Sequence, residues 1–224
     1  MAKRLTYIYY LIGGITLFGL VSFGQNVIRT ETENRNYYTH WAEYTQPQKE
    51  NLLMLMPESE VRKALLDMAR KEVYVVEKTN NNDHPRISYY NKIARSSARA
   101  AYCAAGQYAM AKELGLVYNL KSPAAVRGWF TDKRTIIYNR GKWTSNAQLM
   151  DYIWIYGSHL EALAQPNIDP DIDDDDEILT IGFNTTAGTR KHGVHHPIWR
   201  RWGDVQLMTN QVTPAYLQLK NKYQ

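Results

Sequence analysis

The sequence contains a single cysteine, Cys103, in 224 residues. One thiol excludes an intrachain disulfide framework, so packing alone must hold the fold together. The chain also lacks an internal repeat, which argues against a repeat array. It has neither a zinc-finger spacing nor a concentrated basic helix, so nucleic acid is not expected as a partner.

Apolar residues make up 44% of the chain, which is enough to build the core of one globular domain. Six Trp and seventeen Tyr are many for this length, and they suit either an aromatic core or a substrate groove. The net charge of +5 is modest and fits a polyanionic surface, such as a cell wall or a layer of lipid headgroups.

The amino terminus carries a long uncharged run, Leu5–Phe23, directly after Lys3 and Arg4. Its length suits a membrane-spanning helix with its amino terminus in the cytoplasm. The same run also suits a secretory signal peptide that is cut after Gly24. Both alternatives predict that the rest of the chain is exported. We therefore expect a signal peptide or anchor over residues 1–24, a linker over 25–50 and a folded domain over 51–224.

The order of predicted elements places helices before strands, which favours an α+β fold with an antiparallel sheet. Helical spacing of apolar residues predicts helices over 58–73 and near 101–115, and Ser-Pro at 122 predicts a short helix that ends at Phe130. Residues 87–93 form a short apolar and aromatic segment. Extended segments are expected at 134–138, 148–156, 158–164, 177–183, 194–201 and 204–208.

Cys103 lies at the predicted start of the helix that ends at Gly115. A helix amino terminus has unpaired N–H groups and partial positive charge, so it stabilises a thiolate and can receive an oxyanion. The alternative is that the thiol is buried as a small hydrophobic side chain, as free cysteines often are.

A nucleophilic thiolate needs a histidine base that a third polar group orients. His159 opens a predicted strand after the Gly157 turn, and Asn184 ends the strand that precedes the NTTAG turn. His40 and His84 are most simply surface residues. The basic run that holds His192, His195 and His196 matches no standard metal site.

The segment Asp169–Glu177, DPDIDDDDE, is strongly acidic. Alternating acids can bind Ca²⁺ through oxygen ligands. However, there is no Gly at the EF-hand turn position and no Glu at the closing position of such a loop. Between two predicted strands it is most simply a solvated loop. No other cofactor is expected.

Several segments together resemble the CHAP family, the cysteine, histidine-dependent amidohydrolases/peptidases of bacteria and phages. They follow the family order over about the last two-thirds of the chain. The matching segments are Ala69–Ile93, Ala101–Gly115, Ser122–Phe130, Tyr152–Ala162 and Ile178–His195. The ordered series Cys-Ala-Ala, Ser-His and Asn-Thr is the most specific part of the likeness.

The resemblance implies a papain-like fold with Cys103 as nucleophile, His159 as base and Asn184 at the third position. It implies that the substrate is the stem peptide of peptidoglycan or its amide link to muramic acid, cut outside the cytoplasm. That places the protein in the periplasm or cell envelope, or makes it a phage lysin. Three places depart from the family pattern. Tyr102 stands where Trp is usual, Leu149-Met150-Asp151 stands where the strand before the histidine usually opens with Gly-Asp, and Gly182 stands where relatives often have Glu.

Trp129, Trp154 and Tyr102 are the predicted substrate-binding residues, although both tryptophans are equally suited to the core. Because Gly182 removes a family carboxylate, a second hypothesis is an impaired relative that binds cell wall or serves as a structural component of a virion or envelope. A third is a thiol enzyme that acts on another amide.

Overall fold

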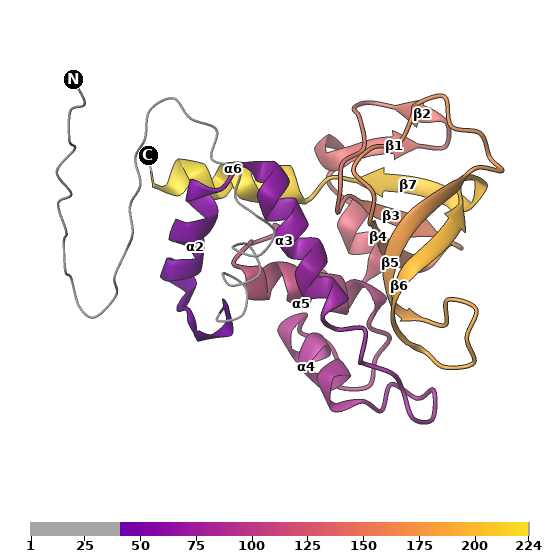
Figure 1. Ribbon diagram of the computed structural model, residues 1–224, viewed down its shortest axis with the longest axis horizontal. Helices are drawn as coiled ribbons and strands as arrows, with labels where there is room; N and C mark the ends of the chain where they lie inside the picture. The colour runs from indigo at the N-terminus through magenta and orange to yellow at the C-terminus, as the bar shows by residue number, and fades with distance from the viewer. Residues whose placement is uncertain (1–40, 224) are drawn as a thin grey trace, which may run out of the picture. The chain divides into compact units, whose positions relative to one another are not determined.

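The computed structural model describes residues 41–223 (Figure 1). Within them, five α-helices and a seven-stranded antiparallel sheet form an α+β fold, as the order of elements predicts. The predicted anchor or signal peptide, residues 1–24, lies outside the described residues. None of the helices described within 41–223 combines the length and apolarity that crossing a membrane requires.

The helices gather on one side of the sheet (Figure 1). They are α2 (Gln46–Leu55), α3 (Glu58–Arg70), α4 (Pro85–Ile93), α5 (Cys103–Leu114) and α6 (Val212–Lys222). Helix α5 is the central one, and nine of its twelve residues are buried. It ends where Gly115 adopts a left-handed conformation with φ of 108°, as the sequence predicts.

Every neighbouring pair of strands in the sheet is antiparallel, and the order is β2-β1-β7-β3-β4-β5-β6. The strands are β1 (Ile136–Asn139), β2 (Lys142–Trp143), β3 (Tyr152–Ile155), β4 (His159–Leu163), β5 (Glu177–Thr185), β6 (Gly193–Arg201) and β7 (Val205–Thr209). Short 3₁₀ turns lie at η1 (Trp41–Glu43), η2 (Val126–Phe130), η3 (Lys133–Thr135) and η4 (Trp202–Asp204).

Three helical segments differ from the sequence expectation. Residues 87–93 belong to α4, and α6 follows the last strand. Helix α2 begins at Gln46, and Trp41 is buried with its indole N–H donating to the carbonyl oxygen of Glu113 at 3.2 Å. The packed part of the chain therefore starts before the predicted boundary at residue 51.

The two faces of the sheet bury different cores. Tyr152, Leu160 and Phe183 pack against the helices. Ile153, Ile155 and Met208 point to the opposite face and form a second core. This division follows from the strand period of two, which sends neighbouring side chains to opposite faces.

A close approach seats α5 on the sheet. A Cβ at Gly106 would lie 2.1 Å from the Phe183 ring, so only glycine lets the helix come this near to β5. One residue along, the Gln107 side-chain amide donates to the carbonyl oxygen of Ile181 at 3.1 Å. These contacts fix the start of α5, and with it Cys103, relative to β4 and β5.

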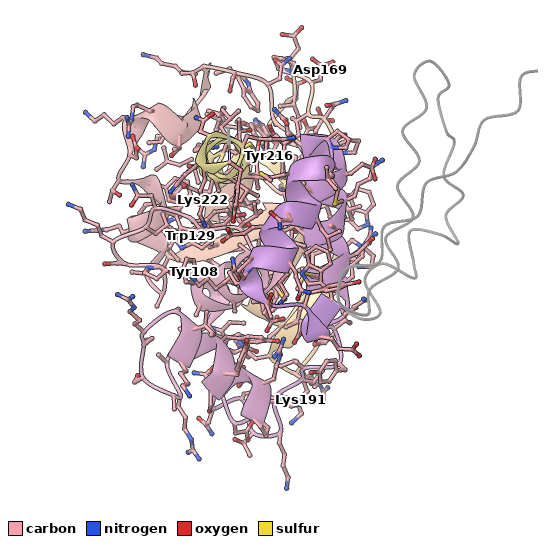
Figure 2. The ribbon with its side chains drawn as sticks, turned by 90° about the vertical axis from the view of Figure 1, so that its left-hand side faces the viewer. Tyr108, Trp129, Asp169, Lys191, Tyr216 and Lys222 are labelled. Carbon is pink, nitrogen blue, oxygen red and sulfur yellow. The ribbon has the colours of Figure 1, made fainter. Side chains whose placement is uncertain are left out.

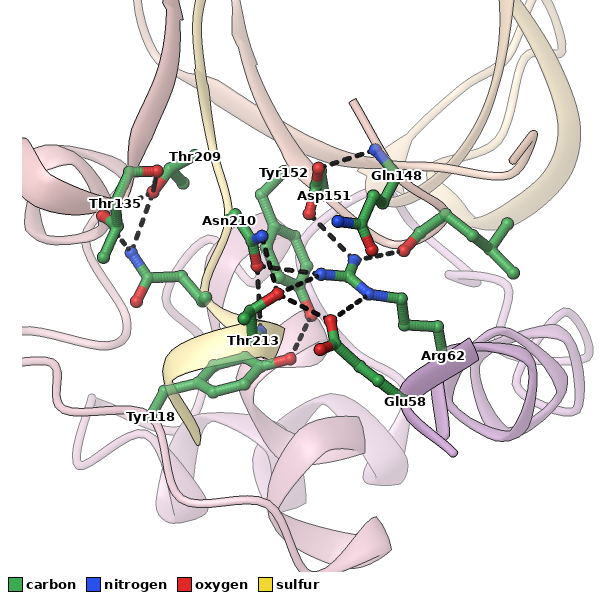
Figure 3. A network of polar contacts seen from close by, with 12 residues as sticks. Glu58, Arg62, Tyr118, Thr135, Gln148, Asp151, Tyr152, Thr209, Asn210 and Thr213 are labelled. Carbon is green, nitrogen blue, oxygen red and sulfur yellow. Dashed lines mark hydrogen bonds and ion pairs between the residues drawn. The ribbon is translucent and has the colours of Figure 1, made fainter. Parts of the chain in front are cut away.

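A buried arginine, Arg62 of α3, ties the helices to the sheet and to α6 (Figure 3). Its guanidinium pairs with Glu58 at 2.8 Å and with the fully buried Asp151 at 2.9 Å. The remaining acceptors are the carbonyl oxygen of Leu149, Asn210 Oδ1 and Thr213 Oγ1. Every guanidinium nitrogen therefore has a partner, which a buried charge requires.

Candidate active site

Cys103 is the first residue of α5, as the sequence predicts. The i to i−4 ladder starts with the Gly106 N–H donating to the carbonyl oxygen of Tyr102 at 2.8 Å. The N–H groups of the first turn are therefore not used inside the helix. That of Ala104 hydrogen-bonds the Cys103 sulfur. Cys103 is buried, with 6% of the residue exposed.

His159 is the first residue of β4, opposite Ile155 of β3. The hairpin turns at Tyr156 and Gly157, which both have positive φ (52° and 73°), the combination of a tight type I′ turn. The His159 ring hydrogen-bonds the Cys103 thiol, and the Leu160 N–H also reaches the sulfur. The fold thus brings together two residues that are 56 positions apart in the sequence.

The surroundings of the pair favour its charged form. Burial would raise the pKa of the Cys103 thiol, but the hydrogen bond and charge of His159 outweigh burial and hold that pKa below its usual value. Burial likewise disfavours the imidazolium of His159, yet the thiol and Glu161 raise its pKa to about 9. The lowered pKa of Cys103 and the raised pKa of His159 both favour a thiolate–imidazolium pair.

The third member of the arrangement is Glu161, which the sequence reasoning missed. It lies two residues after His159 on β4, so both side chains point to the same face of the sheet. His159 Nε2 and Glu161 Oε1 are 3.2 Å apart, which leaves the Nδ1 side of the ring for the thiol. Burial opposes ionisation of Glu161, but His159 and Arg200 hold its pKa at about 2. The available signal was a glutamate inside an apolar strand, because such a residue is almost never fully buried unless it is paired.

Gly182 stands at the position where the resemblance leads us to expect a glutamate. It lies directly across from Glu161 in the β4–β5 pairing. A Cβ at Gly182 would meet Glu161 Oε1 at 2.8 Å, so this position must stay free of a side chain while Glu161 occupies the space. The glycine therefore accompanies a carboxylate on the neighbouring strand.

Asn184 is the predicted partner of the His159 ring, but the group that lies 3.2 Å from Nε2 of that ring is Glu161 Oε1. Asn184 lies two residues beyond the last β4–β5 pair at Gly182, with a φ of 54° that takes the strand out of regular geometry. Its backbone hydrogen-bonds the Tyr102 hydroxyl. The residue pattern did not indicate this local change of backbone direction, and a role for Asn184 as third residue stays a prediction.

The predicted substrate-binding aromatics all pack in or against the helix-side core, but they differ in burial. Trp129 and Tyr102 are both 0% exposed and belong to the helix-side core. The Trp129 indole donates to the carbonyl oxygen of Pro123, and the Tyr102 hydroxyl donates to Glu77. Trp154 is half-buried on β3 opposite Leu160 and packs against the helix-side core, with its ring centre 5.2 Å from that of Phe130. Its indole nitrogen has no hydrogen-bond partner among the described residues.

The acidic segment lies away from the pair. It joins the end of β4 to the start of β5, opposite the end at which His159 begins its strand. Figure 2 places Asp169 of this segment and Lys191 of the β5–β6 connection at opposite ends of the molecule. Within residues 41–223, no group of three or more His, Cys, Asp or Glu side chains is placed to hold a metal ion.

Two hollows lie among the described residues. The larger, about 280 Å³, is bordered by Ser96, Tyr108 and Lys121, and the smaller, about 130 Å³, by Trp129 and Gln211. Neither is lined by Cys103 or His159. Comparison of the chain with protein-family models, with curated proteins and with solved structures found no match.

Proposed function

We propose that this chain is a thiol hydrolase that cuts a peptide or amide bond of the bacterial cell wall. The observation that carries the proposal is the contact between the Cys103 thiol at a helix start and the His159 ring. The cell-wall substrate, an exported location and a papain-like fold follow from the resemblance to the CHAP family. The predicted anchor or signal peptide fits that location.

In the proposed reaction, the Cys103 thiolate attacks the carbonyl carbon of the scissile bond. The first-turn N–H groups of α5, beginning with that of Cys103 itself, receive the developing oxyanion. Protonated His159 gives its proton to the leaving amine, so the C–N bond breaks and an acyl-thioester remains. Water then attacks the thioester with His159 as base, and the thiolate is regenerated.

Glu161 is the proposed positioning residue. Its carboxylate holds the imidazole by Nε2 and stabilises the imidazolium that forms when the thiol ionises. With Glu161 in this role, Gly182 no longer argues for an impaired relative. The proposed catalytic residues are thus Cys103 and His159, and contact of Trp154 with substrate stays a prediction.

The experiment combines thiol labelling with digestion of purified sacculi. Wild-type Cys103 should react rapidly and selectively with iodoacetamide at neutral pH, and His159→Ala should slow this reaction. Hydrolysis should fall as the pH rises through about 9, where His159 loses its proton. Mass analysis of released fragments separates an amidase from an endopeptidase.

Three results would contradict the proposal. Sluggish labelling of the wild type would indicate an ordinary buried thiol, and intact sacculi together with tight binding would favour the binding hypothesis. Equal clearing of sacculi by wild type and Cys103→Ser would exclude the thiol mechanism.

A further inference from the structure

We infer that Arg200 is a positioning residue for the proposed hydrolysis: it fixes the Glu161 carboxylate so that one oxygen meets the His159 ring. The inference rests on the proposed function. It concerns a residue near the carboxyl end of the chain that no motif singled out.

The first observation is the two-point contact between Arg200 and Glu161. Arg200 Nε lies 3.0 Å from Oε2, and Nη2 lies 2.5 Å from Oε1. Thr180 Oγ1 donates to Oε2 at 2.6 Å. Oxygen Oε1 is therefore shared between Arg200 and His159, while Oε2 is held by Arg200 and Thr180. A planar fork of this kind fixes the plane of a carboxylate, which a single bond to histidine cannot do.

The second observation is that Arg200 is itself held in place. Its Nη2 donates to Thr185 Oγ1 at 3.0 Å, and its guanidinium carbon lies 5.7 Å from the centre of the Tyr156 ring. The Tyr156 hydroxyl in turn contacts Asp204. Since Arg200 pairs with Ile178 in the β5–β6 register, its side chain must reach along the sheet to Glu161. The contacts with Thr185 and Tyr156 hold the guanidinium of Arg200 in this extended position.

The third observation is burial. Glu161 is 0% exposed, and the Arg200 side chain is 14% exposed. Water therefore does not reach the carboxylate while Arg200 is in place. Without Arg200, Glu161 is free to turn away from His159, or to take up a proton, and either change removes the orienting contact. A purely structural ion pair would affect stability but would leave the reactivity of the folded thiol unchanged.

The experiment measures the iodoacetamide alkylation rate of Cys103 against pH in full-length protein whose folding is checked by circular dichroism. In Arg200→Gln, we expect alkylation at neutral pH to slow by about 10- to 100-fold, as is typical when a supporting partner of a site is removed. The pH midpoint should move towards that of an ordinary thiol, about 8.5. Arg200→Lys should recover part of the rate because it keeps the charge but loses the fork.

Two further variants keep the test decisive. Arg201→Gln changes the next residue, which is exposed, and should behave as wild type. Thr180→Val removes the second hold on Oε2 and should slow alkylation by less than Arg200→Gln, which covers the case in which the latter fails to fold. In the Glu161→Gln background, Arg200→Gln should cause no further loss, because both act through one carboxylate.

Folded Arg200 and Thr180 variants with wild-type alkylation profiles would overturn the inference, as would losses that multiply in the double variant. Either result, combined with a reactive wild-type thiol, would leave the proposed function standing. A sluggish wild-type thiol would instead contradict the proposed function itself.

Discussion

Arg62 and Arg200 each hold a fully buried carboxylate, but the surroundings of the two carboxylates differ. Arg62 holds Asp151 where α3 meets the sheet, and Arg200 holds Glu161 beside His159. Both carboxylates are 0% exposed. Burial raises the pKa of Asp151 to about 6 despite Arg62, whereas His159 and Arg200 overcome burial and hold the pKa of Glu161 at about 2.

The difference lies in the number of cations that each carboxylate receives. Asp151 shares its arginine with Glu58, another acid, so the charge on Arg62 is divided. Glu161 contacts both an arginine and a histidine, and no second carboxylate shares that arginine among the described residues. The same residue types therefore build a structural joint in one place and, in our proposal, an orienting device in the other.

The largest expected effect is a loss of hydrolytic activity when Glu161 is changed but not when Asp151 is changed. Glu161→Gln keeps the shape of the side chain but removes the charge that holds the imidazolium, so sacculus hydrolysis should fall by up to about 10⁴-fold. Asp151→Asn, the matched change at the structural pair, should leave hydrolysis per folded molecule unchanged. Turnover of purified sacculi measures both, and equal losses in the two variants would contradict the distinction.

The next effect is on stability. Arg62→Leu leaves Asp151 buried without its cation, which should lower the free energy of unfolding by about 3–5 kcal/mol. Lys63→Leu changes an exposed neighbour and should cost far less. Urea denaturation followed by fluorescence gives both values. A cost for Arg62→Leu no larger than that for Lys63→Leu would show that this network does not stabilise the fold.

The pH dependence of stability should have opposite signs at the two pairs. Asp151 has a raised pKa in the folded state, so its contribution is present below its unfolded value of 3.8 and is lost as the pH rises through about 6. Glu161 has a lowered pKa, so its contribution is present above 4.5 and is lost as the pH falls towards about 2. Each term amounts to at most about 3 kcal/mol.

The measurement is the unfolding free energy of wild type, Asp151→Asn and Glu161→Gln between pH 3 and pH 7. Relative to wild type, Asp151→Asn should gain stability as the pH rises, and Glu161→Gln should lose it. Parallel curves for the two variants would contradict the opposite pKa shifts.

The smallest effect concerns the space that Glu161 occupies. Gly182→Ala places a Cβ 2.8 Å from Oε1, so the carboxylate must shift and alkylation of Cys103 should slow by about tenfold. Gly193→Ala is the control, since its Cβ meets the carbonyl oxygen of Val75 at 2.7 Å, away from Glu161. It should destabilise the fold without changing thiol reactivity. Equal alkylation rates in both variants would show that the carboxylate tolerates displacement.

The elements that carry the site were largely predictable because their signals are local. The start of α5 at Cys103, its end at Gly115 and the strand that opens at His159 follow from helix propensity, a glycine stop and a turn. Helix α6 was missed, although Val212, Ala215 and Leu219 lie at helical spacing on its buried face. In the structure, α6 packs beside α2 and α3, and this packing buries that face.

By itself, the sequence determined that Cys103 begins a helix and that helices precede an antiparallel sheet, because propensity and periodicity act between near neighbours. Only the tertiary structure decided which polar group meets the His159 ring. That choice depends on strand register, on the room left by Gly182 and on the reach of Arg200 from β6. Such contacts join residues far apart in the chain, and no local pattern encodes their distances.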